Sequence, residues 1–128
     1  MGRILVLVVV ICAASLAHAD KRIVDNKGIT SHDCAKDPSL AIVGNDNWVT
    51  VTGDCANVVI AGNNNTLKIA GARKLSVPGT SNTISVERVD AIVTPGTKNA
   101  VTWKQGFTAK APTTSDTGTA NKVAAAKP

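Results

Sequence analysis

The sequence is poor in aromatic residues: its 128 residues include no tyrosine, one phenylalanine and two tryptophans. A chain with so few large side chains cannot fill an ordinary globular core, and it has to bury many small β-branched residues in a regular array. Acidic residues number only nine, and histidine occurs twice. These shortages weigh against sites that need paired carboxylates or clusters of metal ligands.

Long apolar stretches are lacking except at the N-terminus. Residues 1–19 combine a positive start at Arg3, an apolar run over positions 4–14 and an Ala-His-Ala pattern at 17–19. This arrangement predicts a cleaved signal peptide, because the run is shorter than the ~20 apolar residues that span a bilayer. Cleavage removes one of fourteen basic residues, so thirteen face nine acids and the net charge is about +4. We therefore expect a secreted or periplasmic protein.

Two cysteines, Cys34 and Cys55, remain after the signal peptide. An even number of cysteines in an exported chain predicts a disulfide, and two cysteines allow one connectivity. A bridge closing this loop is expected to stabilise the fold by about 3 kcal/mol.

A four-residue pattern, Gly-x-x-Asn, recurs through the centre of the chain. Its glycines are spaced 18, 17 and 17 residues apart, and its asparagines have the same spacing. The eight residues are Gly44, Asn47, Gly62, Asn65, Gly79, Asn82, Gly96 and Asn99. Short stretches of strict alternation flank each pattern, which predicts two strands with one buried face in each repeat.

The constant period predicts a chain that coils back above itself. An antiparallel meander or a sandwich would also give alternating strands, but neither requires the same turn at every second connection. In a coil, equivalent residues stack about 4.8 Å apart, and the asparagines would form a ladder in which each amide bonds the next. We therefore expect an all-β fold: a single small β-solenoid of four to five coils, each with 17–18 residues and two short strands.

Sixteen positions of these coils are expected to point inward, and fifteen of them are apolar. They are Leu40, Ile42, Val49, Val51, Val58, Ile60, Leu67, Ile69, Leu75, Val77, Ile84, Val86, Ile92, Thr94, Val101 and Trp103.

The ends of such a stack need cover, because an open end is an exposed sheet edge. We expect residues 20–39 to form an N-terminal cap and residues 40–107 to form the solenoid repeats. At the far end, the large side chains of Trp103 and Phe107 suit a plug.

Residues 108–123 admit two interpretations, a degenerate fifth repeat with its turn at 118–121 or a tail. As a repeat, they would carry their extra residues at 113–117 and point Ala109 and Ala111 inward. Residues 124–128 are expected to be disordered.

The order of these motifs resembles a known family. A Cys, Ile-Val-Gly-Asn-Asp-Asn, Thr-Gly-Asp-Cys, repeated Gly-x-x-Asn-Thr turns, Val-Thr-Trp and a late Gly-Thr-x-Asn follow one another over roughly residues 29–123. This arrangement is similar to the bacterial exported family called domain of unknown function 3060. That family has no established activity, so the resemblance implies an exported bacterial protein and favours the fifth repeat. The chain departs from the family's pattern at Trp48, Leu67 and Pro78.

The repeats contain no evident catalytic constellation. Their acids are Asp46, Asp54, Glu87 and Asp90. The first two lie in different turns, and Glu87 is expected to stack near Lys68 and Lys104. We interpret His32, beside Cys34, as a surface residue, because an oxidised cysteine is not a thiolate ligand. We predict no catalytic residue, no metal site and no cofactor.

The basic residues of the repeats do not form a stripe. They are Lys68, Arg73, Lys74, Arg88 and Lys104, and acidic residues interrupt them. Nucleic-acid binding needs a basic surface with aromatic stacking, so we expect no nucleic-acid partner. An anionic envelope polymer fits the mild positive charge better.

The two outward faces of the repeats differ. The face after each turn is polar, with Thr50, Thr52, Lys68, Ala70, Ser85, Glu87, Thr102 and Lys104. The face before each turn is small, flat and apolar, with Ala41, Val43, Val59, Ala61, Ser76, Pro78, Val93 and Pro95. We consider three interpretations of this second face: a contact surface, a surface covered by the chain's own tail or N-terminal segment, or positions that tolerate small residues.

We therefore expect an exported, non-enzymatic module with a structural or binding role at the bacterial cell envelope. Its partner would be an envelope protein, an anionic envelope polymer or a second copy held through the apolar face. The alternative is a carbohydrate-active β-helix protein that binds or cleaves polysaccharides. An enzyme of that kind gathers carboxylates in one groove, whereas this sequence places them apart.

Overall fold

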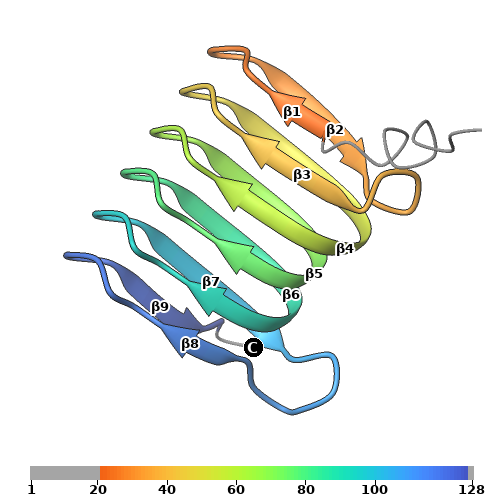
Figure 1. Cartoon of the computed structure of the whole chain (residues 1–128), viewed down its shortest axis with the longest axis vertical. Coiled ribbons are helices and arrows are strands. Elements are labelled where there is room, and N and C mark those ends of the chain that lie inside the picture. Colours follow the sequence, from red (N-terminus) through yellow and green to blue (C-terminus); the bar gives the residue numbers. More distant parts are fainter. Residues whose placement is uncertain (1–20, 127–128) are drawn as a thin grey trace, which may run out of the picture.

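The computed structural model describes residues 21–126, which form nine β-strands and no helix. The strands are β1 (Lys21–Ile23), β2 (Ile29–Asp33), β3 (Ser39–Ile42), β4 (Trp48–Ile60), β5 (Thr66–Ser76), β6 (Thr83–Val93), β7 (Ala100–Gln105), β8 (Thr113–Ser115) and β9 (Lys122–Ala125). Their pairings are all parallel, and the chain winds as six stacked coils (Figure 1). The predicted β-solenoid is confirmed, with six coils rather than four to five. The predicted signal peptide, 1–19, lies outside the described residues.

Each coil consists of a strand, a tight turn, a second strand and a bend. The tight turns line up along one side of the stack, which we call the turn edge (Figure 1). On the opposite side, the bend edge, β4, β5 and β6 continue from one coil into the next without a break. Half of each long strand therefore belongs to one coil and half to its successor.

The core lies between the two strand layers. Fifteen of the sixteen predicted inward residues are buried, and Trp103 is half-buried against them. At the bend edge, Cys55, Ala72 and Val89 stack in register and are also buried, a column that the alternation pattern did not predict. Thr94 is the polar exception, and its buried hydroxyl has no hydrogen-bond partner within residues 21–126.

Gly53 explains why the repeat from Gly44 to Gly62 is one residue longer than the two that follow it. The register between β4 and β5 shifts between Val51 and Asp54, and Gly53 in this stretch has a φ of 78°. Glycine adopts this left-handed conformation without the steric cost that a Cβ brings. The extra residue is thus absorbed at the bend edge, and the turns stay aligned.

The N-terminal segment forms a coil of the same kind as the repeats. β1 pairs with β3 and β2 pairs with β4, so residues 21–38 continue the solenoid by one coil beyond the expected boundary at residue 40. Its turn reads Asp-Asn-Lys-Gly at 25–28, with Asp25 in the glycine position and Gly28 in the asparagine position. Because of these two residues, the Gly-x-x-Asn pattern did not predict this coil.

Residues 113–125 form the last coil, in which β8 pairs with β6 and β9 pairs with β7. The placement of the extra residues at 113–117 was wrong: β8 begins at Thr113, and the longer connection lies at 106–112. Ala109 and Ala111 are exposed in that connection, and Thr114 is the residue that aligns with Ile92. The expected disorder of 124–128 is also wrong for Ala124 and Ala125, which end β9; residues 127–128 are not described.

The disulfide between Cys34 and Cys55 is confirmed. Its Cα atoms are 5.0 Å apart, and both residues are buried at the bend edge. Because Cys34 follows β2 and Cys55 lies within β4, the bridge ties the first coil to the next.

Candidate functional site

The glycines of the turn edge allow the coils to approach closely. A Cβ on Gly62 would lie 1.8 Å from the carbonyl oxygen of Gly44, and a Cβ on Gly79 would lie 1.9 Å from that of Gly62. The left-handed residue of each turn is instead the third one, such as Asp46 with a φ of 58°. The first turn position is therefore glycine because a Cβ has no room there. The third turn position adopts the left-handed backbone conformation.

Each asparagine of the ladder clamps the turn of the preceding coil. Asn65 Oδ1 accepts a hydrogen bond from the Asn47 backbone N–H at 2.9 Å, and its Nδ2 donates to the Gly44 carbonyl oxygen at 2.9 Å. Asn82 and Asn99 repeat both bonds one coil further along. The expectation that each amide bonds the next amide was largely wrong, because the partners are mainly backbone groups.

Direct contacts between ladder amides are confined, within residues 21–126, to the C-terminal coils. Asn82 Nδ2 donates to Asn99 Oδ1 at 3.0 Å, and Asn99 Nδ2 donates to Asn121 Oδ1 at 3.1 Å. A second, exposed row was not predicted: the backbone N–H groups of Asn45 and Asn63 donate to the side-chain oxygens of Asn26 and Asn45. The turn edge is thus a hydrogen-bonded seam, and between neighbouring coils its groups are occupied by its own chain.

The bend edge carries a cluster of charges around Phe107. Arg88 Nη2 lies 2.6 Å from Asp54 Oδ1, and Arg73 Nη1 lies 3.2 Å from Asp90 Oδ2. Both guanidinium groups lie over the Phe107 ring, at 4.5 Å for Arg73 and 5.1 Å for Arg88. The prediction that Phe107 plugs the far end is therefore wrong: the ring lies against the side of the stack.

Gly71 leaves the room for this cluster. A Cβ there would lie 2.5 Å from Asp54 Oδ1 and 2.9 Å from Phe107 Cζ. The Phe107 backbone N–H donates to Asp90 Oδ1 at 2.9 Å, and this bond, with a smaller contribution from Arg73, lowers the pKa of Asp90 below its usual 3.8 against a partial desolvation that raises it. The cluster fastens the 106–112 connection to the coils.

The predicted basic residues divide into paired and unpaired ones. Arg73 and Arg88 have the partners described above, and Lys104 Nζ lies 3.5 Å from Glu87 Oε1. Within the described part of the chain, Lys68 and Lys74 have no ion-pair partner. Because of these ion pairs, the positive charge of the repeats does not form a continuous surface.

His32 is held by the chain itself. Its Nε2 lies 2.9 Å from the Asp37 carbonyl oxygen, which only accepts, so this nitrogen carries the proton. Cys34 beside it is in the disulfide. Over residues 21–126, His, Cys, Asp and Glu side chains do not gather in groups of three that could hold a metal.

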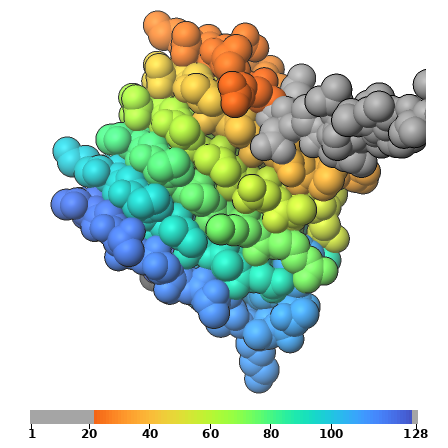
Figure 2. Space-filling view, viewed as in Figure 1, coloured from red at the N-terminus to blue at the C-terminus, as the bar shows by residue number. Residues whose placement is uncertain are grey.

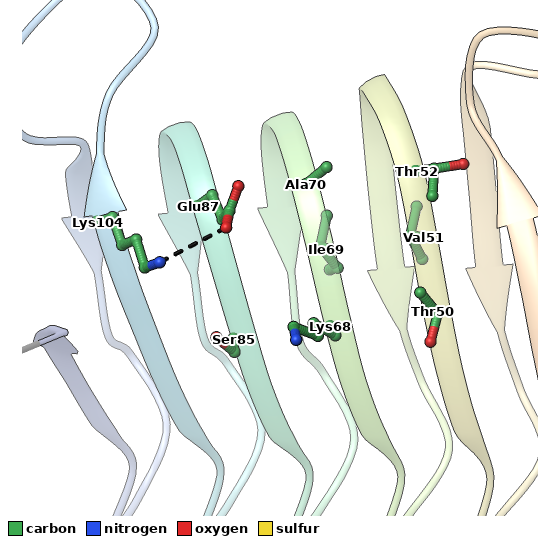
Figure 3. A pocket seen from close by; sticks show the side chains of 9 residues that line it. All are labelled: Thr50, Val51, Thr52, Lys68, Ile69, Ala70, Ser85, Glu87 and Lys104. Atoms are coloured by element: carbon green, nitrogen blue, oxygen red, sulfur yellow. Dashed lines mark ion pairs between the residues drawn. The ribbon is translucent and has the colours of Figure 1, made fainter.

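A shallow depression of about 270 Å³ lies on the polar face. It is lined by Thr50, Val51, Thr52, Lys68, Ile69, Ala70, Ser85, Glu87 and Lys104. Figure 3 shows the short side chain of Ala70 with longer polar side chains around it, and the ion pair of Glu87 and Lys104 on one side. The hollow offers hydroxyl groups, two ammonium groups and one carboxylate.

The opposite face, built on β1, β3, the second halves of β4, β5 and β6, and β8, is the apolar face of Ala41, Val43, Val59, Ala61, Ser76, Pro78, Val93 and Pro95. All eight are half-buried or exposed, so the alternation that sends Val58, Ile60 and Ile92 inward turns them out. The coils of this face lie side by side as parallel rows in Figure 2. Residues 113–126 form the last coil instead of folding over it, and residues 21–38 form the first.

Large exposed apolar side chains concentrate in the first two coils. Val43 belongs to the apolar face and has 46% of its surface exposed, and Val24 beside it has 59% exposed. Ile29 and Trp48 lie beyond the turn, with 89% and 58% exposed. Val24 extends the apolar face by one coil, because it lies one position beyond β1, whose Ile23 pairs with Ile42. Sequence reasoning missed Val24 because it placed this segment in a cap.

The parallel coils and their Gly-x-x-Asn turns define the molecule as a β-solenoid repeat protein. The chain belongs to the family described as "Protein of unknown function (DUF3060)", whose model matches residues 42–79 and 61–121. Searches of curated proteins and of solved structures returned no match. No helix in residues 21–126 has the length and apolar character to cross a membrane.

Proposed function

We propose that this protein is an exported, non-enzymatic module that acts at the bacterial cell envelope through its apolar face. The observation that carries the proposal is the contrast between its two faces. One presents hydroxyls and charges around a depression, while the other presents eight small residues without a charge on adjacent coils. Burying such a surface against another molecule is favourable, because apolar area leaves water.

The occupant we propose for the apolar face is a second copy of the chain. Sheets with apolar facing side chains pack about 10 Å apart, and a second copy supplies a face of matching flatness and chemistry. A two-fold contact between identical faces closes after two subunits. An anionic polymer fits this face less well, because its eight residues carry no charge, and Arg22 in β1 and Lys74 in β5, cations on the same strands, lie on coils that are not adjacent.

Export is supported by the N-terminal charge and hydropathy pattern. The buried disulfide is compatible with an oxidising compartment, where such bonds persist. Together these two features favour the envelope or the space beyond it over the cytosol.

Replacing Val59 and Val93 by Lys tests the apolar face. The long side chains can reach water from outward positions, so we expect an almost unchanged melting temperature and loss of the dimer in sedimentation velocity. The matched control is Thr50→Lys with Ser85→Lys, which adds the same charge to the polar face and should leave the dimer intact. A wild-type protein that stays monomeric at all concentrations would contradict self-association. Capture of an envelope protein or polymer that is lost in the Val59→Lys, Val93→Lys protein would then identify a different occupant.

A second candidate function is carbohydrate binding at the depression of the polar face. The hydroxyls of Thr50, Thr52 and Ser85 beside the Glu87–Lys104 pair favour it, because sugars are bound through such donors and acceptors. Binding rather than cleavage is proposed, since one carboxylate lines the hollow. Ala70→Trp should fill the hollow and abolish binding of envelope polysaccharide in a glycan titration, with no effect on the dimer. Equal binding by wild type and the variant would remove this candidate.

A further inference from the structure

The last coil presents four unpaired backbone groups at its turn. Within residues 21–126, the N–H groups of Ala120 and Asn121 and the carbonyls of Gly118 and Asn121 have no hydrogen-bond partner. At an inner junction the equivalent groups are all bonded: Asn64 N–H to Thr80 O at 3.0 Å, Asn65 N–H to Asn82 Oδ1 at 2.9 Å, Gly62 O to Asn82 Nδ2 at 3.0 Å, and Asn65 O to Thr83 N–H at 2.9 Å. The C-terminal end is therefore ready to receive another coil.

The first described coil has the wrong residues to stack on that end. Every later coil has glycine at the first turn position, where a Cβ would lie 1.8–1.9 Å from the carbonyl oxygen of the coil before it. The first coil has Asp25 there, and its Cβ would meet the Gly118 carbonyl of another copy in the same way. At the fourth position Gly28 has no amide, so the Asn121 N–H would stay unpaired and the Gly118 carbonyl would lack the side-chain donor that Asn82 gives to Gly62.

We infer that the Asp25-x-x-Gly28 turn is a stop that prevents copies of this chain from stacking head to tail. A head-to-tail contact would keep the backbone bonds of a regular junction, such as Ala120 N–H to the Asn26 carbonyl, but it would lose both bonds that the ladder side chain makes. It would also bring Asp25 Cβ into overlap with a backbone oxygen. This inference does not depend on the proposed role of the apolar face.

Such a stop prevents the end-to-end association that the open ends of a solenoid allow. Open ends of a parallel solenoid are sheet edges that can pair with any edge of the same spacing. An end-to-end contact is heterologous and does not close, so without a stop it would extend into filaments. The N-terminal turn blocks this contact with two residues and leaves the interior coils unchanged.

The test converts the stop into a regular turn. The variant Asp25→Gly with Gly28→Asn carries Gly-Asn-Lys-Asn at 25–28 and is expected to form elongated polymers whose mass rises with concentration in sedimentation velocity. The wild-type protein is expected to form none. Two matched variants separate the two features: Asp25→Ala with Gly28→Asn keeps a Cβ, and Asp25→Gly with Gly28→Ala lacks the amide. Both should remain the size of the wild type, with circular dichroism confirming the fold of each.

Hydrogen exchange identifies the interface of these polymers. The Asn121 backbone amide should become protected in the Asp25→Gly, Gly28→Asn polymer, and adding Val59→Lys and Val93→Lys should not dissolve it. Head-to-tail polymers of the wild-type protein would overturn the inference. A folded Asp25→Gly, Gly28→Asn protein of wild-type size at every concentration would overturn it equally, as would polymers that the two lysines dissolve.

Discussion

The turn edge and the bend edge of this solenoid hold the coils together in different ways. At the turn edge, the same backbone and asparagine bonds recur from coil to coil, and the spacing is uniform. The bend edge has a disulfide, the extra residue Gly53, ion pairs around Phe107 and the long 106–112 connection. Irregular length is thus absorbed where side chains join the coils, and it is excluded where a continuous backbone seam requires equal spacing.

Adding one methyl group at each edge should show most clearly that the two edges differ in how tightly the coils pack. Gly79→Ala places a Cβ 1.9 Å from the Gly62 carbonyl oxygen, which is backbone and cannot move aside. We expect a loss of about 3 kcal/mol or more, or no folding. Gly71→Ala meets the ends of Asp54 and Phe107, which can shift, so we expect about 1 kcal/mol. Urea unfolding measures both, and equal losses would mean that the turn edge is not the tighter one.

Removing the disulfide tests the strongest link of the bend edge. Cys34→Ala with Cys55→Ala opens a loop whose cysteines are 21 residues apart, and we expect a loss of about 3 kcal/mol of unfolding free energy. The native protein should show no free thiol until it is unfolded and reduced. Two titratable thiols in the native protein would show that the first two coils are held by packing alone.

Truncating one ladder residue should cost less. Asn82→Ala leaves the Asn65 N–H unpaired in the interior and leaves the Gly62 carbonyl with only the longer bond from Thr80 N–H, which we expect to destabilise the fold by about 1–3 kcal/mol. Asn121→Ala exposes the equivalent groups at the end of the stack, where water can reach them, and should cost clearly less. Equal melting temperatures for the two variants would remove the ladder from the account.

The smallest effect is expected from titrating Asp90 at the bend edge. Its lowered pKa means that the folded state holds the carboxylate charged, so its contribution is present above pH 3.8 and is lost as the pH falls through the lower folded value. We expect the Phe107 amide to lose protection in that range while the Asn65 amide keeps it. In Asp90→Asn this step should vanish, and a wild-type Phe107 amide insensitive to acid would contradict the docking of the connection.

The inward residues and the turns were predictable because both follow directly from backbone geometry. Alternation assigns Val58 and Val59 to opposite faces, and close stacking demands glycine at positions such as Gly62. The first coil was not predicted, because Asp25 and Gly28 occupy the positions where the later turns have glycine and asparagine. That difference is tolerated there, since among the described residues no coil lies beneath Asp25 for its Cβ to strike.

The bend edge was not predictable from local patterns. Ala72 and Val89 turn inward after a bend that resets the alternation, and the place of Phe107 depends on Gly71 and two arginines from other coils. The depression of the polar face was missed for a similar reason. It arises where the small Ala70 lies among longer neighbours on adjacent coils, which only the stacked register brings together.

Hydrogen exchange of five asparagine backbone amides tests the central claim most directly. The claim is that each ladder asparagine donates its backbone N–H to the following coil, so that the row of bonds ends at the last coil. The backbone N–H groups of Asn47, Asn65, Asn82 and Asn99 each donate to the side-chain oxygen of the next ladder asparagine. Asn121 has no further coil to donate to within the described chain. We predict strong protection for the first four amides and rapid exchange for Asn121 in the wild-type protein. Protection of Asn121 equal to that of Asn82 would contradict the account, because it would mean that another coil covers the C-terminal end.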